Sequence, residues 1–353
     1  MKTILLIISS LFTLLFCSCK EEVPVTGDGF TYTPTTALRD KASFPFGVAI
    51  QAGRISNPAY GSLVSKEFSS LTAEYEMKQN ITATGPATYN WTPTDQIVNF
   101  AQANNQRVHG HALLWHSAVP DWITNFSGSS AEFDTVMKNY IHAVVGRYKG
   151  KVASWDVVNE AFEDQSGNLR NTVFRTKMGD DYIARCFQYA READPDVWLF
   201  YNDYGTIYDN KKLDAMLAMI DDFQTRGIPI DGVGFQMHIS YNWPSLSQIQ
   251  NAVDKVKSRG LKIHFSELDI RANPDGDLTQ LTTDRATDLQ KRYKDIVTLY
   301  KGIPEAQQFG ITVWGLKDNE SWLINFWGNP EWPLLFDAES KYKLAHKGVI
   351  EAL

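Results

Sequence analysis

Short apolar runs alternate with longer amphipathic segments along most of the chain, beginning at Phe44. The eight apolar runs are rich in residues that favour strands and cover residues 44–50, 69–75, 107–115, 152–160, 198–204, 232–239, 262–270 and 310–316. Strands that alternate with helices are typical of parallel strands joined by crossover helices. We therefore predict an α/β fold, a (β/α)8 TIM barrel that occupies residues 36–353 as a single domain.

The segments between these runs have apolar positions at helical spacing and end at Gly, Pro or Asp-Pro, which are stop signals for helices. We predict helices over residues 130–148, 175–192, 209–226, 245–259 and 282–300. Nothing in the pattern indicates a second domain.

Most of the apolar runs contain or close with ionisable, amide or indole side chains. In barrels of this kind the active site is built at the C-terminal ends of the strands. The side chains in question are Glu74, His111, Trp115, Asn159, Glu160, Asn202, Asp203, Gln236, His238, Glu267 and Asp269. We expect them to converge on one mouth of the barrel.

Two carboxylates in this set suggest a particular chemistry. Glu160 and Glu267 end the fourth and seventh runs, so they should face each other across the mouth. Two opposed carboxylates are the machinery of glycoside hydrolysis: one protonates the leaving oxygen, and the other attacks the anomeric carbon or activates water. Taken singly, either Glu could instead be the partner of a structural ion pair.

The two-residue period of a strand adds neighbours to Glu267. Glu267 and Asp269 should share a strand face, as should Gln236 and His238. His238 could then hydrogen-bond to Glu267 and fix its orientation and ionisation. The alternative is a histidine that is satisfied within the core.

Six segments of the chain carry a resemblance to a known family. They are LTAEYEMK (71–78), HGHALLWHS (109–117), WDVVNEAF (155–162), GFQMHIS (234–240), HFSELDI (264–270) and VWGLKDNESW (313–322). Together they resemble the signature segments of glycoside hydrolase family 10, the retaining endo-β-1,4-xylanases, in the family's order along the whole barrel.

The resemblance implies roles for individual residues. Glu160 would be the general acid/base and Glu267 the nucleophile, supported by Asn159, His238 and Asp269. Asn159 matches the donor to the sugar 2-hydroxyl. The residues expected to bind substrate are Glu74, Lys78, His111, Trp115, Tyr204, Gln236, Trp314 and Trp322. Tyr204 is included as a further stacking platform, and for any single Trp the alternative is core packing.

Three positions depart from the family's pattern. Tyr75 stands where the family has Asn, Ala118 where it has Gln, and Leu323 where it has Arg. In the family these residues shape the binding of sugars on the non-reducing side of the scissile bond. We therefore predict that the chemistry is retained and that the preference on the glycone side is altered.

The first residues are expected to be a targeting signal. Residues 1–18 have a basic start at Lys2 and an apolar stretch typical of a signal peptide, and Ser18-Cys19 resembles a bacterial lipobox. We expect lipidation at Cys19, a tether over residues 19–35, and an outer-membrane lipoprotein displayed on the cell surface. The alternative is a plain signal peptide and a periplasmic or secreted protein.

Composition narrows the partners. The chain has 34 Lys and Arg against 41 Asp and Glu, a formal net charge of −7, which argues against nucleic acid as a partner. No dinucleotide-binding or P-loop motif occurs, and His111 and His116 have no carboxylate at ligand spacing. We expect no cofactor, no metal, no membrane contact beyond the lipid, and a monomer.

These observations favour an endo-β-1,4-xylanase that cuts xylan by double displacement. Two other readings stay open: a barrel glycosidase that acts on another β-glucan or on short oligosaccharides, and a surface lipoprotein that binds xylan without cutting it.

Overall fold

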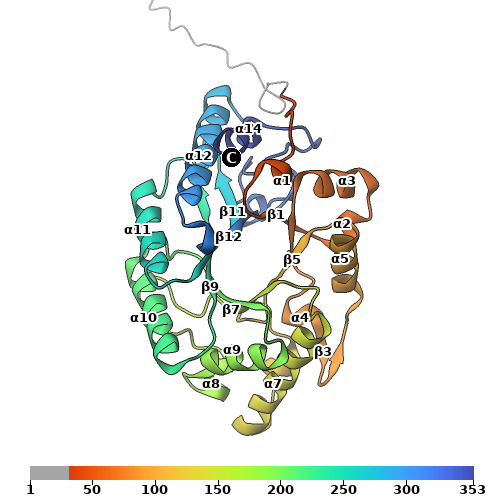
Figure 1. The fold of residues 1–353 in the computed structure, drawn as a ribbon, viewed down its shortest axis with the longest axis vertical. Coiled ribbons are helices and arrows are strands. Elements are labelled where there is room, and N and C mark those ends of the chain that lie inside the picture. Colours follow the sequence, from red (N-terminus) through yellow and green to blue (C-terminus); the bar gives the residue numbers. More distant parts are fainter. Residues whose placement is uncertain (1–31) are drawn as a thin grey trace, which may run out of the picture.

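The computed structural model describes residues 32–353, and its centre is a closed barrel of eight parallel strands (Figure 1). The barrel strands are β1 (Phe46–Ile50), β2 (Ser70–Ala73), β5 (Arg107–Gly110), β7 (Ser154–Asn159), β8 (Trp198–Asp203), β9 (Gly232–Phe235), β11 (Lys262–Arg271) and β12 (Gln308–Val313). Each strand pairs in parallel with the next, and β12 pairs with β1 to close the ring. The predicted (β/α)8 TIM barrel is confirmed.

Helices surround the strands in Figure 1. They are α1 (Leu38–Lys41), α2 (Ala52–Ile55), α3 (Pro58–Glu67), α4 (Gln79–Thr82), α5 (Thr92–Ala103), α6 (Asp121–Thr124), α7 (Ser130–Arg147), α8 (Val173–Met178), α9 (Tyr182–Ala193), α10 (Asn210–Arg226), α11 (Leu246–Lys257), α12 (Thr283–Lys301), α13 (Trp322–Trp327) and α14 (Leu344–Ala352). The described residues also form two 3-10 turns, Glu305–Gln307 and Asp318–Glu320, and a small hairpin of β3 (Ala83–Gly85) and β4 (Thr88–Tyr89).

Three predicted elements prove to be divided. The helix predicted over 175–192 is two helices, α8 and α9, because Gly179 ends the first with a positive φ of 80° that a non-glycine residue would adopt only with strain. The third run divides into β5 and β6 (Leu114–Trp115). The sixth divides into β9 and β10 (His238–Ser240) at Met237, whose φ is 62°.

The core lies between the barrel and its helices. The barrel strands β1, β2 and β7 are buried along their whole length, as expected of strands covered by crossover helices. Local sequence sets several helix ends: Ser129 and Glu132 form a capping box at the start of α7, and Ser245 and Gln248 form another at α11.

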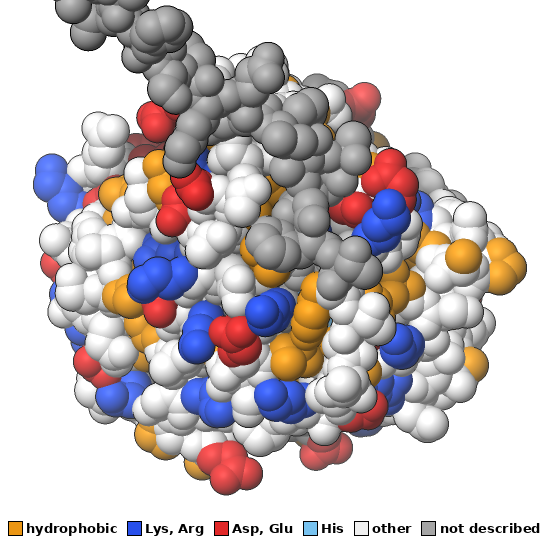
Figure 2. Space-filling model, turned by 90° about the horizontal axis from the view of Figure 1, so that it is seen from above, with side chains coloured by type: hydrophobic (Ala, Val, Ile, Leu, Met, Phe, Trp, Pro, Cys, Tyr) orange, Lys and Arg blue, Asp and Glu red, His pale blue; other side chains and the backbone are white. Residues whose placement is uncertain are grey.

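The face of the molecule seen in Figure 2 mixes Lys and Arg with Asp and Glu, and apolar side chains are scattered among them. Among residues 32–353, none of the helices is both long and apolar enough to span a membrane. The predicted signal peptide, Cys19 and the tether as far as residue 31 lie outside the described residues.

Candidate active site

The two glutamates meet at the mouth of the barrel. Glu267 lies within β11 and is 5% exposed, while Glu160 directly follows β7. Three amides connect the two carboxylates. Asn202 donates to Glu267 Oε1 (2.7 Å) and to Asn159 Oδ1 (3.0 Å), and Gln236 donates to Asn159 Oδ1 (3.3 Å) and to Glu160 Oε1 (2.9 Å). The expected convergence of the two strand ends is therefore present.

The backbone turns sharply at Glu160. Its φ is 56°, in the left-handed region that residues other than glycine rarely adopt. Neighbours in a regular strand point to opposite faces, but here the Asn159 side chain donates to its neighbour's Oε1 at 3.3 Å. The turn thus brings two consecutive side chains to the same mouth.

Glu267 is surrounded by groups that favour its charged form. His238 Nε2 lies 3.3 Å from Oε2, and His111 Nδ1 lies 4.0 Å from Oε1. Burial by itself would raise the pKa of Glu267, but the charge that His111 carries when protonated, together with His238 and Asn202, holds this pKa below its ordinary value. The predicted contact between His238 and Glu267 is confirmed.

His238 is itself held between two carboxylates. Its Nδ1 lies 3.0 Å from Asp269 Oδ2, which also accepts a hydrogen bond from Trp322 Nε1 at 2.8 Å. Burial opposes the charge on His238, but Asp269 and Glu267 outweigh it and raise the pKa of His238 to about 10. The two carboxylates therefore favour the charged form of His238, which lies within 3.3 Å of both of them.

Glu160 is contacted by neutral donors instead. Trp115 Nε1 donates to Oε2 at 2.8 Å, and Gln236 and Asn159 donate to Oε1. The Gln236 and His238 side chains both reach the mouth, but they contact different glutamates. The single strand expected to carry them is interrupted, because β9 ends at Phe235, β10 begins at His238, and Met237 between them has a left-handed backbone.

The other residues expected to bind substrate lie around these two carboxylates. Lys78 is buried, and its Nζ lies 4.6 Å from the centre of the Trp115 ring. Burial lowers the pKa of Lys78, and Glu267 and Glu74 partly oppose that change. Trp314 packs edge-on against His111, with ring centres 5.3 Å apart, and Trp322 packs against His238.

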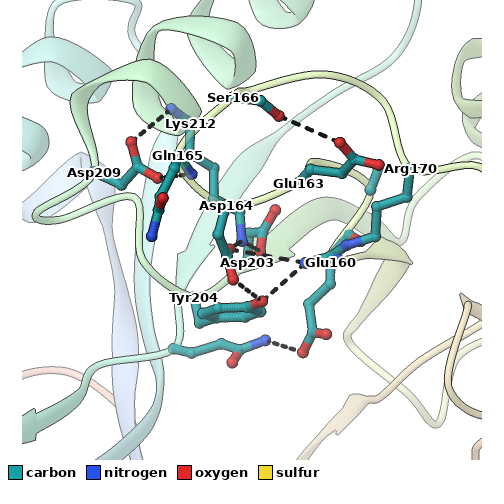
Figure 3. A network of polar contacts seen from close by, with 12 residues as sticks. Glu160, Glu163, Asp164, Gln165, Ser166, Arg170, Asp203, Tyr204, Asp209 and Lys212 are labelled. Atoms are coloured by element: carbon teal, nitrogen blue, oxygen red, sulfur yellow. Dashed lines mark hydrogen bonds and ion pairs between the residues drawn. The ribbon is translucent and has the colours of Figure 1, made fainter.

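Glu74 and Tyr204 have further partners. Glu74 is buried and accepts a hydrogen bond from Gln51 Nε2 at 2.9 Å. Tyr204 donates its hydroxyl to Asp164 Oδ2 at 2.7 Å, and Lys212 Nζ lies 3.5 Å from the centre of its ring (Figure 3). One face of the expected Tyr204 platform is therefore covered by an ammonium group.

Two residues that contact the site were given no role by the sequence analysis. Asn202 was expected at the mouth but was given no role, although it joins Glu267 to Asn159. Asp156 is fully buried and pairs with His111 Nδ1 at 2.9 Å. Burial would raise the pKa of Asp156, but His109 and His111 hold it well below its usual range. A charged residue inside an apolar strand was the available signal for Asp156.

The segment after β12 contains the short helix α13, of which Trp322 is the first residue and Trp327 the last. The helix directs Trp322 into the site, while Trp327 is half exposed and stacks with Arg271, whose guanidinium carbon lies 4.2 Å from the ring centre.

This geometry suits a two-step displacement at a sugar. A carboxylate kept ionised can attack carbon, and a second carboxyl held by neutral donors can deliver and recover a proton. Within residues 32–353, His, Cys, Asp and Glu side chains form no group of three or more that could hold a metal ion.

Comparison with known proteins points to one family. Residues 36–352 match the model of glycosyl hydrolase family 10. The chain is 40% identical to endo-beta-1,4-xylanase Xyn10C of Cellvibrio japonicus over 90% of its own length and 57% of that protein's. It is 34% identical to endo-1,4-beta-xylanase B of Paenibacillus barcinonensis, covering 89% of this chain and 96% of that one. The chain thus spans little more than half of the first relative.

Solved structures agree. A mutant of xylanase 10C from Cellvibrio japonicus in complex with xylopentaose superposes with a TM-score of 0.88 and 38% identity, covering 92% of this chain and 70% of that one. A family 10 structure from Paenibacillus barcinonensis superposes with a TM-score of 0.86 and 34% identity, covering 90% and 97%. The chain belongs to glycosyl hydrolase family 10.

Proposed function

We propose that the chain is an endo-β-1,4-xylanase that hydrolyses internal bonds of xylan with retention of anomeric configuration. Glu160 protonates the leaving oxygen while Glu267 attacks the anomeric carbon; water, deprotonated by Glu160, then hydrolyses the covalent glycosyl-enzyme. The observation that carries this proposal is the pair of carboxylates, one directly after β7 and one within β11, joined through Asn159, Asn202 and Gln236. The xylanase names of the relatives and the xylopentaose complex support the substrate.

The test is hydrolysis of xylan by the purified protein, measured as reducing-end release, with Glu267→Gln as the inactive control. Proton NMR of the first product should show the β-anomer before mutarotation. Product length separates internal cleavage from the release of single sugars, and parallel assays on β-glucans address the alternative substrate. Binding of xylan without any cleavage would contradict the proposal.

The proposal extends to an altered preference on the glycone side. Tyr75 is 45% exposed, and Lys78 Nζ lies 4.9 Å from its ring centre, whereas Ala118 and Leu323 are buried and offer no side-chain hydrogen bond. Each hydrogen bond missing relative to the family contributes about 0.5 to 1.5 kcal/mol. We expect weaker binding of undecorated chains and a relative preference for decorated xylan. The test is the ratio of kcat/KM on decorated xylan to kcat/KM on plain xylo-oligosaccharides. A ratio equal to that of a relative with the usual residues would contradict this preference.

We also propose that the protein is a lipoprotein on the outer surface of the cell, since the Ser18-Cys19 motif favours lipidation at Cys19 and the acidic residues Glu21 and Glu22 that follow favour surface display. Separately, we expect the protein to be a monomer. Labelling with a fatty-acid analogue should mark the wild type and not Cys19→Ala, and protease treatment of intact cells should degrade the wild type. Labelling that persists in Cys19→Ala would contradict the lipid anchor. Light scattering of the soluble domain reports the oligomeric state.

A further inference from the structure

The loop that follows Glu160 folds back to its starting point. Phe162 and Leu169 form an antiparallel bridge, Glu163 N–H donates to Asn168 O at 2.8 Å, and Gly167 with φ 72° makes the reversal. Arg170 N–H then donates to Ala161 O at 2.8 Å. A residue ten positions further along the chain is thereby returned beside the glutamate.

The Arg170 side chain closes this circuit on the backbone of Glu160. Its Nε donates to Glu160 O at 3.0 Å, and its second terminal nitrogen donates to the Tyr204 hydroxyl at 2.8 Å (Figure 3). The amide of Glu160 is held from the other side, because it donates to Asn202 O at 3.0 Å. Both backbone groups of the residue with the left-handed φ are therefore bonded.

The far end of Arg170 is anchored by ion pairs that reach α10. Tyr204 donates to Asp164, whose other oxygen lies 2.9 Å from Lys212 Nζ. Lys212 also pairs with Asp203 at 2.8 Å, and both of these side chains are 0% exposed. The Lys212–Asp203 pair is thus fully buried, and it holds Lys212 in place beside the half-exposed Asp164.

We infer that Arg170 is a positioning residue for the acid/base: it fixes the left-handed backbone of Glu160 and so keeps its carboxyl aimed at the leaving oxygen. Non-glycine residues remain in this region only where the surroundings impose it. Without Arg170 the backbone of Glu160 relaxes, and the carboxyl moves away from Trp115 and Gln236. Glu267 is held by separate strands and keeps its position. The inference rests on the proposed function.

The test compares kcat/KM on two kinds of substrate, since this ratio reports the first displacement. Xylo-oligosaccharides need protonation of the leaving oxygen, whereas an aryl β-xylobioside with a dinitrophenyl leaving group does not. Arg170→Met should lower kcat/KM on xylo-oligosaccharides about 10- to 100-fold and on the aryl substrate less than about 3-fold. Arg170→Lys, which retains the charge and one donor, should recover part of the loss.

The matched control is Arg175→Met. Arg175 also donates to a carbonyl of this loop, Leu169 O at 2.6 Å, and pairs with Asp180, but its hydrogen bonds do not reach Glu160. Arg175→Met should leave kcat/KM unchanged or lower it by the same factor on both kinds of substrate. Tyr204→Phe removes the hydroxyl between Arg170 and Asp164. It should lower kcat/KM less than Arg170→Met does, and again more on xylo-oligosaccharides than on the aryl substrate. This variant therefore provides the test even if Arg170→Met does not fold.

Equal losses on both kinds of substrate in Arg170→Lys and Tyr204→Phe would overturn the inference, as would a substrate-dependent loss in Arg175→Met. A wild-type protein that cleaves neither substrate would instead sink the proposed function. The two failures are therefore distinguishable.

Discussion

Glu267 and Glu160 serve the same mouth, but the molecule holds them in different ways. Glu267 stands inside a strand of ten residues, beside a cationic histidine, and its pKa is lowered. Glu160 stands just past the end of its strand, on a left-handed backbone, and accepts hydrogen bonds from Trp115, Gln236 and Asn159, all of them neutral. This difference suits the roles proposed for them: charged partners favour a nucleophile that stays charged, whereas neutral donors orient an acid/base without fixing its charge.

Removing the proposed nucleophile should have the largest effect. Glu267→Ala deletes the group that we propose forms the covalent intermediate, so we expect kcat on xylan to fall by about 10,000-fold or more. Because attack on carbon is needed whatever the leaving group, activated aryl xylosides should be lost as well. Steady-state assays on both substrates check this, and a variant that kept its aryl-xyloside activity would assign the nucleophile elsewhere.

Removing the acid/base should give a different pattern. Glu160→Ala should lower kcat/KM on xylan by about 100- to 10,000-fold, since that is the usual contribution of general acid catalysis. An aryl xyloside with a good leaving group should keep most of its kcat/KM, because its departure needs no proton. If both substrates lost activity equally, the contrast between the two glutamates would fail.

The pH dependence should separate the two glutamates further. His238 helps to hold the pKa of Glu267 below its ordinary value, so His238→Asn should move the acidic limb of the activity profile to higher pH. We also expect kcat/KM to fall about 10- to 100-fold with the loss of a charged hydrogen bond. A profile measured from pH 3 to 8 provides the check, and an unmoved acidic limb would contradict the role of His238.

The pH dependence of the protein's stability should also reflect the charge of His238. Folding raises the pKa of His238 from 6.5 to about 10, so its contribution is fully present below pH 6.5 and is lost as the pH rises through about 10. Thermal unfolding of the wild type should therefore lose this contribution between those values. In His238→Asn that part of the pH dependence should be absent, and a curve that matches the wild type would argue against a charged His238.

Two tryptophans offer the smallest and most selective comparison. Trp115→Phe removes the donor to Glu160, and Trp322→Phe removes the donor to Asp269, while both keep an aromatic ring. Each should lower kcat/KM about 2- to 10-fold, the range expected for one hydrogen bond. The loss in Trp115→Phe should be greater for poor leaving groups, and that in Trp322→Phe should be the same for all. If the loss depended on the leaving group in Trp322→Phe and not in Trp115→Phe, the distinction between the surroundings of Glu160 and those of Glu267 would be contradicted.

The sequence by itself determined the barrel and the position of its two glutamates. Apolar runs predict strands and amphipathic segments predict helices wherever the repeat of apolar positions continues without a break. Parallel strands in a barrel then bring their carboxyl ends to one mouth. The two-residue spacing of Glu267 and Asp269 was therefore enough to predict that they share a face, and both in fact lie beside His238.

Only the tertiary structure decided where the side chains point at positions that interrupt the regular alternation of a strand. The left-handed turns at Glu160 and Met237 redirect Asn159, Glu160, Gln236 and His238, and alternation along a strand does not foresee them. The return of Arg170 to Glu160 likewise depends on a loop that is held by Tyr204 and by ion pairs from α10. Such contacts join residues far apart in the chain, and their energy comes from burial and pairing that exist only once the barrel has closed.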